Sequence, residues 1–218
     1  MKKQWNAEEK LRFEREMLAA HARYIAGVDE VGRGPLAGPV VCAAVILPLD
    51  EGSLIEGIDD SKKVKESERE RLAALIRERA LAYAVCEESA AVIDEINILE
   101  ATKRCMKRCV EQLAIVPDVM FTDGNFRIDT DLPQQNIVKG DALSYSIGAA
   151  SILAKVYRDA LMCEYDKLYP QYGFAKHKGY GTAAHIAAIG EYGLCEIHRR
   201  TFTKKLSAGQ GSGAPQST

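Results

Sequence analysis

The sequence predicts an α/β fold built on a single sheet of mixed strand direction. Apolar, β-prone segments alternate along the chain with segments whose apolar residues recur at helical spacing. The first two apolar segments are separated only by a short, turn-rich loop, which indicates an antiparallel pair. Three strands followed by helix, strand, strand and helix then give a sheet in which both directions occur.

Five strands are expected, over residues 23–30, 39–47, 81–89, 118–122 and 135–139. Helices are expected over 66–80, 91–114 and 142–159. The last of these is rich in Ala and Ser, which permits close packing against a sheet. Helical segments should also fill most of 158–205, with breaks at Tyr169–Pro170 and at the glycine-rich turn 179–181.

The chain of 218 residues is long enough for one well-buried domain. We expect an N-terminal helical extension over 1–22 and a main domain over 23–206, whose part from about residue 160 is helical. The segment 207–218 has no large apolar residue and is expected to be disordered.

Composition indicates a protein of the cytoplasm that does not enter membranes. Apolar residues make up 47% and charged residues 28% of the chain, as in ordinary globular enzymes. The longest apolar run, Val40–Leu49, is far shorter than the roughly 20 residues that span a bilayer. The first ten residues contain no apolar segment of the kind found in signal peptides. The six cysteines form no C-x-x-C pair, which favours reduced, structural thiols.

Four acidic residues form the candidate site. Asp29 and Glu30 lie side by side at the end of an apolar strand, where a desolvated carboxylate needs a partner charge or a metal ion. Asp123 and Asp141 follow two other strand segments. Because neighbouring strand ends converge, we expect the four carboxylates to lie together.

A cluster made only of carboxylates is typical of a site for hard divalent cations. Oxygen ligands without His or Cys suit Mg²⁺ or Mn²⁺. Two such ions about 4 Å apart can activate a water and stabilise a leaving oxygen during phosphodiester cleavage. For Asp123 and Asp141 an alternative stays open, because Asp-Gly and Gly-Asp are also ordinary, solvated turn sequences.

The loop after the first strand, Gly32-x-Gly34-x-x-x-Gly38, matches no standard phosphate-binding motif. It misses the dinucleotide fingerprint by one residue, and no Lys-Ser/Thr follows it as in a Walker loop. Its glycines nevertheless allow the backbone to approach a ligand closely, and Arg33 is available for a phosphate.

Seven motifs occur in order over about residues 24–203, and jointly they are highly specific. They are Gly27–Gly34, Asp60–Lys63, Asp123–Asn125, Lys139–Asp141, Ala149–Asp159, His177–Thr182 and His198–Phe202. Together these motifs resemble the bacterial ribonuclease HII family, a type 2 ribonuclease H.

The resemblance implies a ribonuclease H-like fold and an endonuclease that cuts RNA–DNA hybrids and ribonucleotides embedded in duplex DNA, for ribonucleotide removal. Cleavage is then expected on the 5′ side of the ribonucleotide, leaving a 3′-OH and a 5′-phosphate. By motif position, the catalytic ligands of two divalent ions would be Asp29, Glu30, Asp123 and Asp141. Gly32, Arg33 and Gly34 would read the 2′-hydroxyl, and Tyr180 would pack against the sugar of the following deoxynucleotide.

The remaining charged residues allow weaker expectations. Lys62 is a candidate phosphate contact, although lysines before a helix are usually solvated. Residues 171–206 carry six basic and two acidic side chains, which predicts a basic face for duplex binding. The histidines at 177, 185 and 198 lack metal-site spacing and are expected at the surface or on phosphates.

The same motifs have two alternative interpretations, a ribonuclease of type HIII and a non-catalytic nucleic-acid-binding module. The related type HIII family usually carries a large N-terminal extension and another sequence at the Arg33 loop. A non-catalytic nucleic-acid-binding module of the same fold would be expected to lose one of the four acids. No amphipathic segment is left over after the core is assigned, so a monomer is expected.

Overall fold

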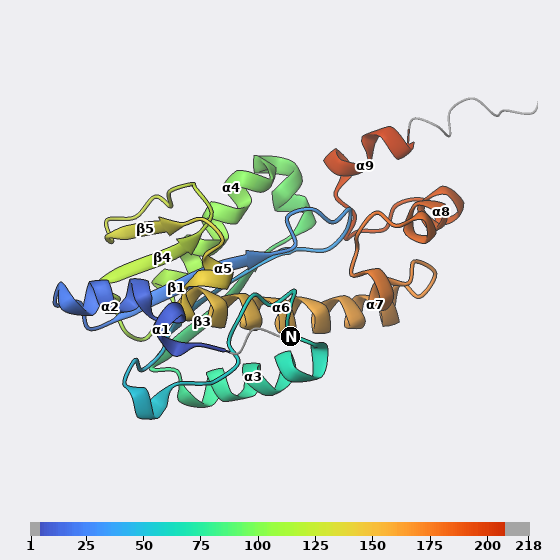
Figure 1. Cartoon of the computed structure of the whole chain (residues 1–218). Helices are drawn as coiled ribbons and strands as arrows, with labels where there is room; N and C mark the ends of the chain where they lie inside the picture. The colour runs from blue at the N-terminus through green and yellow to red at the C-terminus, as the bar shows by residue number, and fades with distance from the viewer. Residues whose placement is uncertain (1–4, 208–218) are drawn as a thin grey trace, which may run out of the picture.

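The computed structural model describes residues 5–207, and a five-stranded sheet runs through its centre (Figure 1). The strands are β1 (Ile25–Val31), β2 (Val40–Ile46), β3 (Ala82–Glu88), β4 (Val119–Asp123) and β5 (Gln134–Ile137). Their order across the sheet is β3-β2-β1-β4-β5. The β1–β2 and β2–β3 pairs are antiparallel, whereas β4 runs parallel to both β1 and β5. The predicted sheet of mixed direction is confirmed, and every strand lies within two residues of its expected bounds.

Helices cover both faces of this sheet (Figure 1). On one face, α3 (Glu66–Arg79) and α6 (Tyr145–Leu168) pack in one apolar cluster with alternate residues of β2 such as Val41 and Val45. On the other face, α4 (Ala90–Glu111) packs in a second cluster with the intervening residues, such as Cys42 and Ile46. Every residue of β2 is buried, as expected for a strand covered on both faces. The six cysteines are free thiols, and four of them are buried.

The helix expected over 142–159 differs from the structure in a way that matters for Asp141. It is two helices, α5 (Gly140–Leu143) and α6, separated by Ser144 in an extended conformation. The Ser144 hydroxyl accepts a hydrogen bond from the Ile147 amide and donates one to the buried Glu14 carboxylate. The prediction of a single helix was therefore wrong, because a side-chain cap supplied by a distant segment interrupts it.

Two other expected helices are also interrupted. The N-terminal segment forms α1 (Ala7–Lys10) and α2 (Arg12–Ala19), which meet at Leu11. Inside α4, Asn97 has a positive φ of 67°, and its side-chain oxygen accepts hydrogen bonds from the amides of Leu99 and Glu100. The domain boundaries at residues 22 and 206 stay predictions, and the expected disordered tail lies outside the described residues except for Ser207.

The C-terminal part of the chain lies beyond one end of the sheet (Figure 1). It contains α7 (Phe174–His177), α8 (Ala183–Tyr192) and α9 (Arg200–Ser207). The loop after β2, in another part of the chain, contains a short 3₁₀ turn, η1 (Glu51–Ser53). An apolar cluster of its own includes Met162 and Phe174. The Asp94 carboxylate of α4 accepts hydrogen bonds from the first two amides of α9. Across residues 5–207, no helix combines the length and the apolar character that crossing a bilayer requires.

The histidines of this C-terminal part form a buried group. His185 and His198 are fully enclosed, and their Nε2 atoms are 3.1 Å apart. The His198 Nδ1 accepts a hydrogen bond from the Cys195 amide at 3.0 Å. The expectation that these two histidines lie at the surface was wrong, because the aromatic rings of Tyr172 and Phe174 surround them.

Replacing Gly27 with alanine should strongly destabilise the fold. A Cβ atom at Gly27 would lie 2.0 Å from the backbone carbonyl carbon of Ser146, so β1 and α6 could no longer pack together. Overpacking of this kind lowers the free energy of unfolding by about 1–3 kcal/mol, and a backbone clash places Gly27→Ala at or above that range. Urea denaturation measures the loss of stability.

Gly190→Ala is the control, because a Cβ atom at Gly190 would have no atom within 4 Å. This substitution should leave the free energy of unfolding unchanged or raise it slightly. Equal stability of the two variants would contradict the close packing at Gly27.

Acidification should destabilise the protein through the buried histidines. Burial, with the neighbouring His185, lowers the pKa of His198 to about 4, whereas an unfolded histidine has a pKa of about 6.5. Between these values the unfolded chain binds the proton and the folded chain does not, so the free energy of unfolding falls as the pH drops from 6.5 towards 4. The contribution of His198 to the slope of the free energy of unfolding against pH approaches about 1.4 kcal/mol per pH unit. Denaturation at several pH values should show a shallower fall in His198→Gln than in wild type.

Candidate active site

The end of β1 carries a carboxylate buried inside the sheet. Asp29 is 6% exposed. Val28 and Thr122, which directly precede Asp29 and Asp123, are paired in the parallel register of β1 and β4. Burial raises the pKa of Asp29 well above its usual range, and the carboxylates of Glu30, Asp123 and Asp141 raise it further. Like charges thus converge in a desolvated place, where a cation would relieve their repulsion.

Glu30 contributes a carboxylate with an unused oxygen. Its Oε1 lies 3.6 Å from Nη1 of Arg33, whereas its Oε2 is buried and has no hydrogen-bond partner. Burial raises the pKa of Glu30; the Arg33 guanidinium lowers it, and Asp123 raises it again. A buried carboxylate oxygen without a partner is rare in native proteins and is typical of an atom that awaits an ion.

The other two acids are linked through the backbone between them. Asp123 ends β4, and its Oδ1 accepts a hydrogen bond from the Gly140 amide at 2.7 Å. Asp141 directly follows Gly140 and lies in the first turn of α5. The expectation that it ends a strand was therefore wrong in detail. Burial, Asp60 and Asp123 raise the pKa of Asp141, against the opposing effect of Lys62.

The four acids fit a site for divalent cations that is assembled but not closed. In the stretch from residue 5 to 207, no three acidic, histidine or cysteine side chains already surround one point closely enough to hold a metal ion. The neighbouring acids nevertheless raise the pKa of Asp29 and that of Asp141, and the donor atoms of the four side chains are all oxygens. A cation would relieve the repulsion and occupy the partnerless oxygen of Glu30.

Lys62 lies beside this cluster on the loop before α3. Its Nζ is 3.8 Å from Oδ2 of Asp141, and the side chain is largely exposed. Partial desolvation lowers the pKa of Lys62, but the carboxylates of Asp141 and Asp60 outweigh this effect and raise it overall. Lys62 is thus a largely exposed cation next to the acids.

The loop after β1 needs glycine at two positions. Gly32 and Gly38 have φ of 93° and 87°, which side chains other than glycine rarely adopt. A Cβ at Gly32 would also lie 2.2 Å from Nε of Arg158. Gly34 is exposed, and a Cβ placed on it would lie 3.8 Å from Cε1 of Tyr180. The structure therefore brings the glycine loop and Tyr180 together, with the ring of Tyr180 45% exposed.

Two buried arginines bind the backbone of this loop from the protein interior. Arg199 donates hydrogen bonds to the carbonyl oxygens of Gly32 (2.5 Å), Arg33 (2.9 Å) and Gly38 (3.0 Å). Arg158 of α6 donates to three further carbonyl oxygens, those of Pro39 (3.0 Å), Lys178 (3.0 Å) and Ala37 (3.2 Å). Burial and the neighbouring Arg158 lower the pKa of Arg199 to about 9, so it remains a cation at neutral pH.

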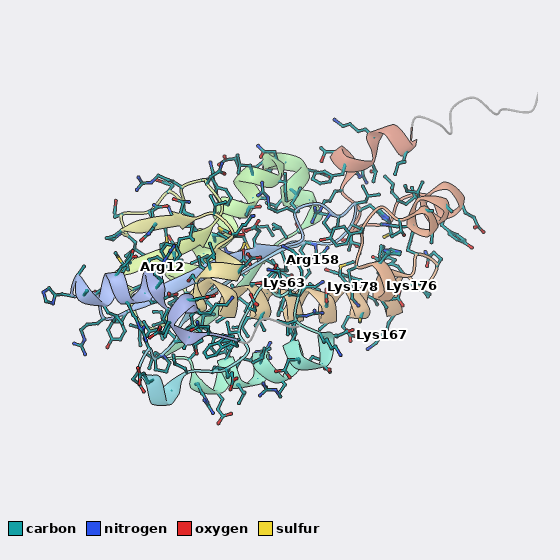
Figure 2. The ribbon with its side chains drawn as sticks, in the orientation of Figure 1. Arg12, Lys63, Arg158, Lys167, Lys176 and Lys178 are labelled. Carbon is teal, nitrogen blue, oxygen red and sulfur yellow. The ribbon has the colours of Figure 1, made fainter. Side chains whose placement is uncertain are left out.

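The predicted basic face over 171–206 is therefore smaller than its composition suggests. Arg199 points into the protein, and the Lys178 ammonium donates to the Ala175 carbonyl and the Cys163 thiol. Figure 2 shows Lys176 and Lys178 on the side of the molecule where the C-terminal helices lie, and Arg158 nearer the centre. Lys176 and Arg200 remain exposed to solvent. Sequence reasoning missed the role of Arg158 and Arg199, because a count of charges carries no information about burial.

Comparisons with known proteins agree with this geometry. The ribonuclease HII family model matches residues 26–205. A ribonuclease HII of Ruminiclostridium cellulolyticum is 55% identical over 196 residues, covering 90% of this chain and 76% of its own. One of Geobacter metallireducens is 57% identical over 178 residues, covering 82% and 83%.

The fold itself is also shared with a solved structure. The ribonuclease H2 from Pyrococcus horikoshii OT3 is similar with a TM-score of 0.73 and 26% sequence identity, over 88% of this chain and 100% of that one. The chain therefore belongs to the ribonuclease HII family, whose members are endoribonucleases that cleave the RNA strand of RNA–DNA hybrids.

Proposed function

We propose that this enzyme also cuts duplex DNA on the 5′ side of an embedded ribonucleotide, leaving a 3′-OH and a 5′-phosphate. One observation carries the proposal. Within six residues of backbone, β1 supplies two of four clustered carboxylates, Asp29 and Glu30, and then the loop from Gly32 to Gly34 beside Tyr180. Groups suited to hydrolysis and groups suited to sugar recognition thus adjoin.

Asp29, Glu30, Asp123 and Asp141 would hold two divalent ions, Mg²⁺ or Mn²⁺. When bound, such ions supply the activation of the attacking water and the stabilisation of the leaving oxygen. The protein's own part is to keep the four carboxylates together against their repulsion. The Asp123–Gly140 hydrogen bond and the burial of Asp29 in β1 support this role.

The glycine loop and Tyr180 would select a ribonucleotide followed by a deoxynucleotide. The 2′-hydroxyl distinguishes RNA from DNA at a given position, and it can both donate and accept hydrogen bonds. In the loop Gly32–Gly34, backbone groups around Gly34 can approach it because Gly34 is exposed and has no side chain. The Tyr180 ring, which lies beside Gly34, would pack on the next sugar, where a second hydroxyl would collide with it.

The side chains of Lys62 and Arg33 would contact substrate phosphates. Both side chains are partly or largely exposed, and each lies within 4.0 Å of one of the acids, Asp141 and Glu30 respectively. All of these groups come from one chain, so a monomer suffices for the proposed reaction. A role in removing ribonucleotides from DNA would place the enzyme in the cytoplasm.

Neutralising Asp29 should abolish cleavage and stabilise the protein when metal is absent. Asp29→Asn keeps the shape of the side chain but removes one of four like charges from a buried cluster. With a duplex that contains one ribonucleotide, we expect kcat to fall by at least about 100-fold. Thermal denaturation in EDTA should give a midpoint at or above that of wild type.

The same prediction extends to Asp141→Asn and to metal binding. Mg²⁺ should raise the thermal midpoint of wild type, because a ligand that binds only the folded state stabilises it, and should raise it less in either variant. Asp129→Asn, which changes a fully exposed acid, is the matched control and should behave as wild type. No cleavage by wild type, or undiminished cleavage by both variants, would refute the proposed function.

Removing the ring of Tyr180 should impair substrate use without impairing metal binding. The Tyr180 carbonyl is held by Nδ1 of His185 at 2.9 Å, so the backbone keeps its place when the ring is lost. We expect Tyr180→Ala to lower kcat/KM on a duplex with one ribonucleotide by about 10- to 100-fold, in line with 1–3 kcal/mol for a lost ring contact. Tyr180→Phe and the exposed control Tyr192→Ala should stay near wild type. Equal losses of metal affinity and cleavage in Tyr180→Ala would contradict this role.

A further inference from the structure

Arg199 is a buried cation without an acidic partner. It is completely enclosed, and no carboxylate lies within salt-bridge distance of it in the described part of the chain. Burying a guanidinium is unfavourable unless its donors find acceptors, and here the acceptors are three carbonyl oxygens of the glycine loop. Such an arrangement adds little to overall stability compared with an apolar side chain, but it fixes the direction of the backbone it binds.

The direction of two peptide units follows from these contacts. In a trans peptide the carbonyl of one residue and the amide of the next point in opposite directions, and no cis peptide occurs among the described residues. Arg199 turns the carbonyls of Gly32 and Arg33 inward, so the amides of Arg33 and Gly34 point away from it. Neither amide donates to another group within residues 5–207. Gly34 itself is exposed beside Tyr180.

The segment that carries Arg199 is itself paired with the loop. Ala37 and His198 form an isolated antiparallel bridge, and the Arg199 amide donates to the Leu36 carbonyl at 2.8 Å. The Gly38 amide donates to the Ile197 carbonyl at 2.8 Å. The backbone around Arg199 thus aligns the far end of the loop, while its side chain reaches the near end at Gly32.

We propose that Arg199 is a positioning residue for ribose recognition, which holds the Gly32 and Arg33 carbonyls inward so that the amides of Arg33 and Gly34 face the 2′-hydroxyl of the substrate. The proposal rests on the proposed function, because it assumes that this loop contacts the sugar. Arg199 does not touch the substrate; it selects RNA over DNA through the backbone that it orients. A lysine at this position keeps the charge but cannot bind three carbonyls in the planar geometry of a guanidinium.

Equilibrium binding in a cleavage-blocked background tests the proposal. In Asp141→Asn, the Kd for an all-DNA duplex is compared with the Kd for the same duplex carrying one ribonucleotide. We expect the background to favour the ribonucleotide by tenfold or more. Adding Arg199→Lys should bring this ratio to about one, while the Kd for all-DNA stays within about twofold. Leu72→Ala, a core change in α3, is the control for lost stability and should keep the preference.

The outcomes separate this inference from the proposed function. Absence of any preference in the Asp141→Asn background would refute sugar recognition by this enzyme and leave Arg199 without the assigned role. A preference that survives Arg199→Lys unchanged would overturn the role of Arg199 alone. If the lysine variant does not fold, Arg199→Gln, which retains an amide donor without the charge, is measured instead and the same ratio decides.

Discussion

The glycine loop after β1 depends on the contact between its carbonyl oxygens and the buried guanidinium of Arg199. Six carbonyls in and around this loop accept hydrogen bonds from two arginines, Arg199 and Arg158, and within residues 5–207 neither arginine forms a salt bridge with a carboxylate. A surface loop normally satisfies its backbone with water and is correspondingly mobile. Here the backbone is satisfied from inside the protein. The C-terminal part of the chain, which carries Arg199 directly before α9, is therefore a structural part of the site.

The two ends of the candidate site place opposite demands on the fold. At the end of β1 the carboxylates repel one another, and under the loop the guanidiniums are removed from water. Between the acids and the loop, Glu30 contacts Arg33 at 3.6 Å, and the Arg33 side chain is 41% exposed, so this ion pair contributes little to stability. Stability must come from elsewhere, and the two apolar clusters on either side of β2 supply it. This division is typical of enzymes, whose sites are held in place by a core that does not take part in the chemistry.

The sequence allowed the strands and the acids to be predicted for physical reasons that the arginines lack. A carboxylate in an apolar strand is an anomaly that is visible in the sequence. The positions of the strands follow from periodicity, and the antiparallel pairing of the first two follows from the short loop between them. Arg158 and Arg199 look like any other basic residue, because their burial arises from contacts with residues more than 100 positions away. The break at Ser144 was equally hidden. Helix propensity is continuous there, and the deciding partner is Glu14, at the other end of the chain.

That break also decides where Asp141 stands. With one continuous helix, Asp141 would follow the axis of α6; with the break, it lies on the separate turn of α5, whose Gly140 amide is bound by Asp123. Close packing keeps this turn in place, since a Cβ at Gly148 would lie 3.1 Å from the Asp141 carbonyl oxygen. The acids on β1 are positioned by the sheet, Asp141 by this capped turn, and the loop by Arg199. Because β1 continues directly into the loop, a shift of the loop backbone would also move Asp29 and Glu30. Under the proposed function, this continuity would couple recognition of the ribose to the geometry of hydrolysis.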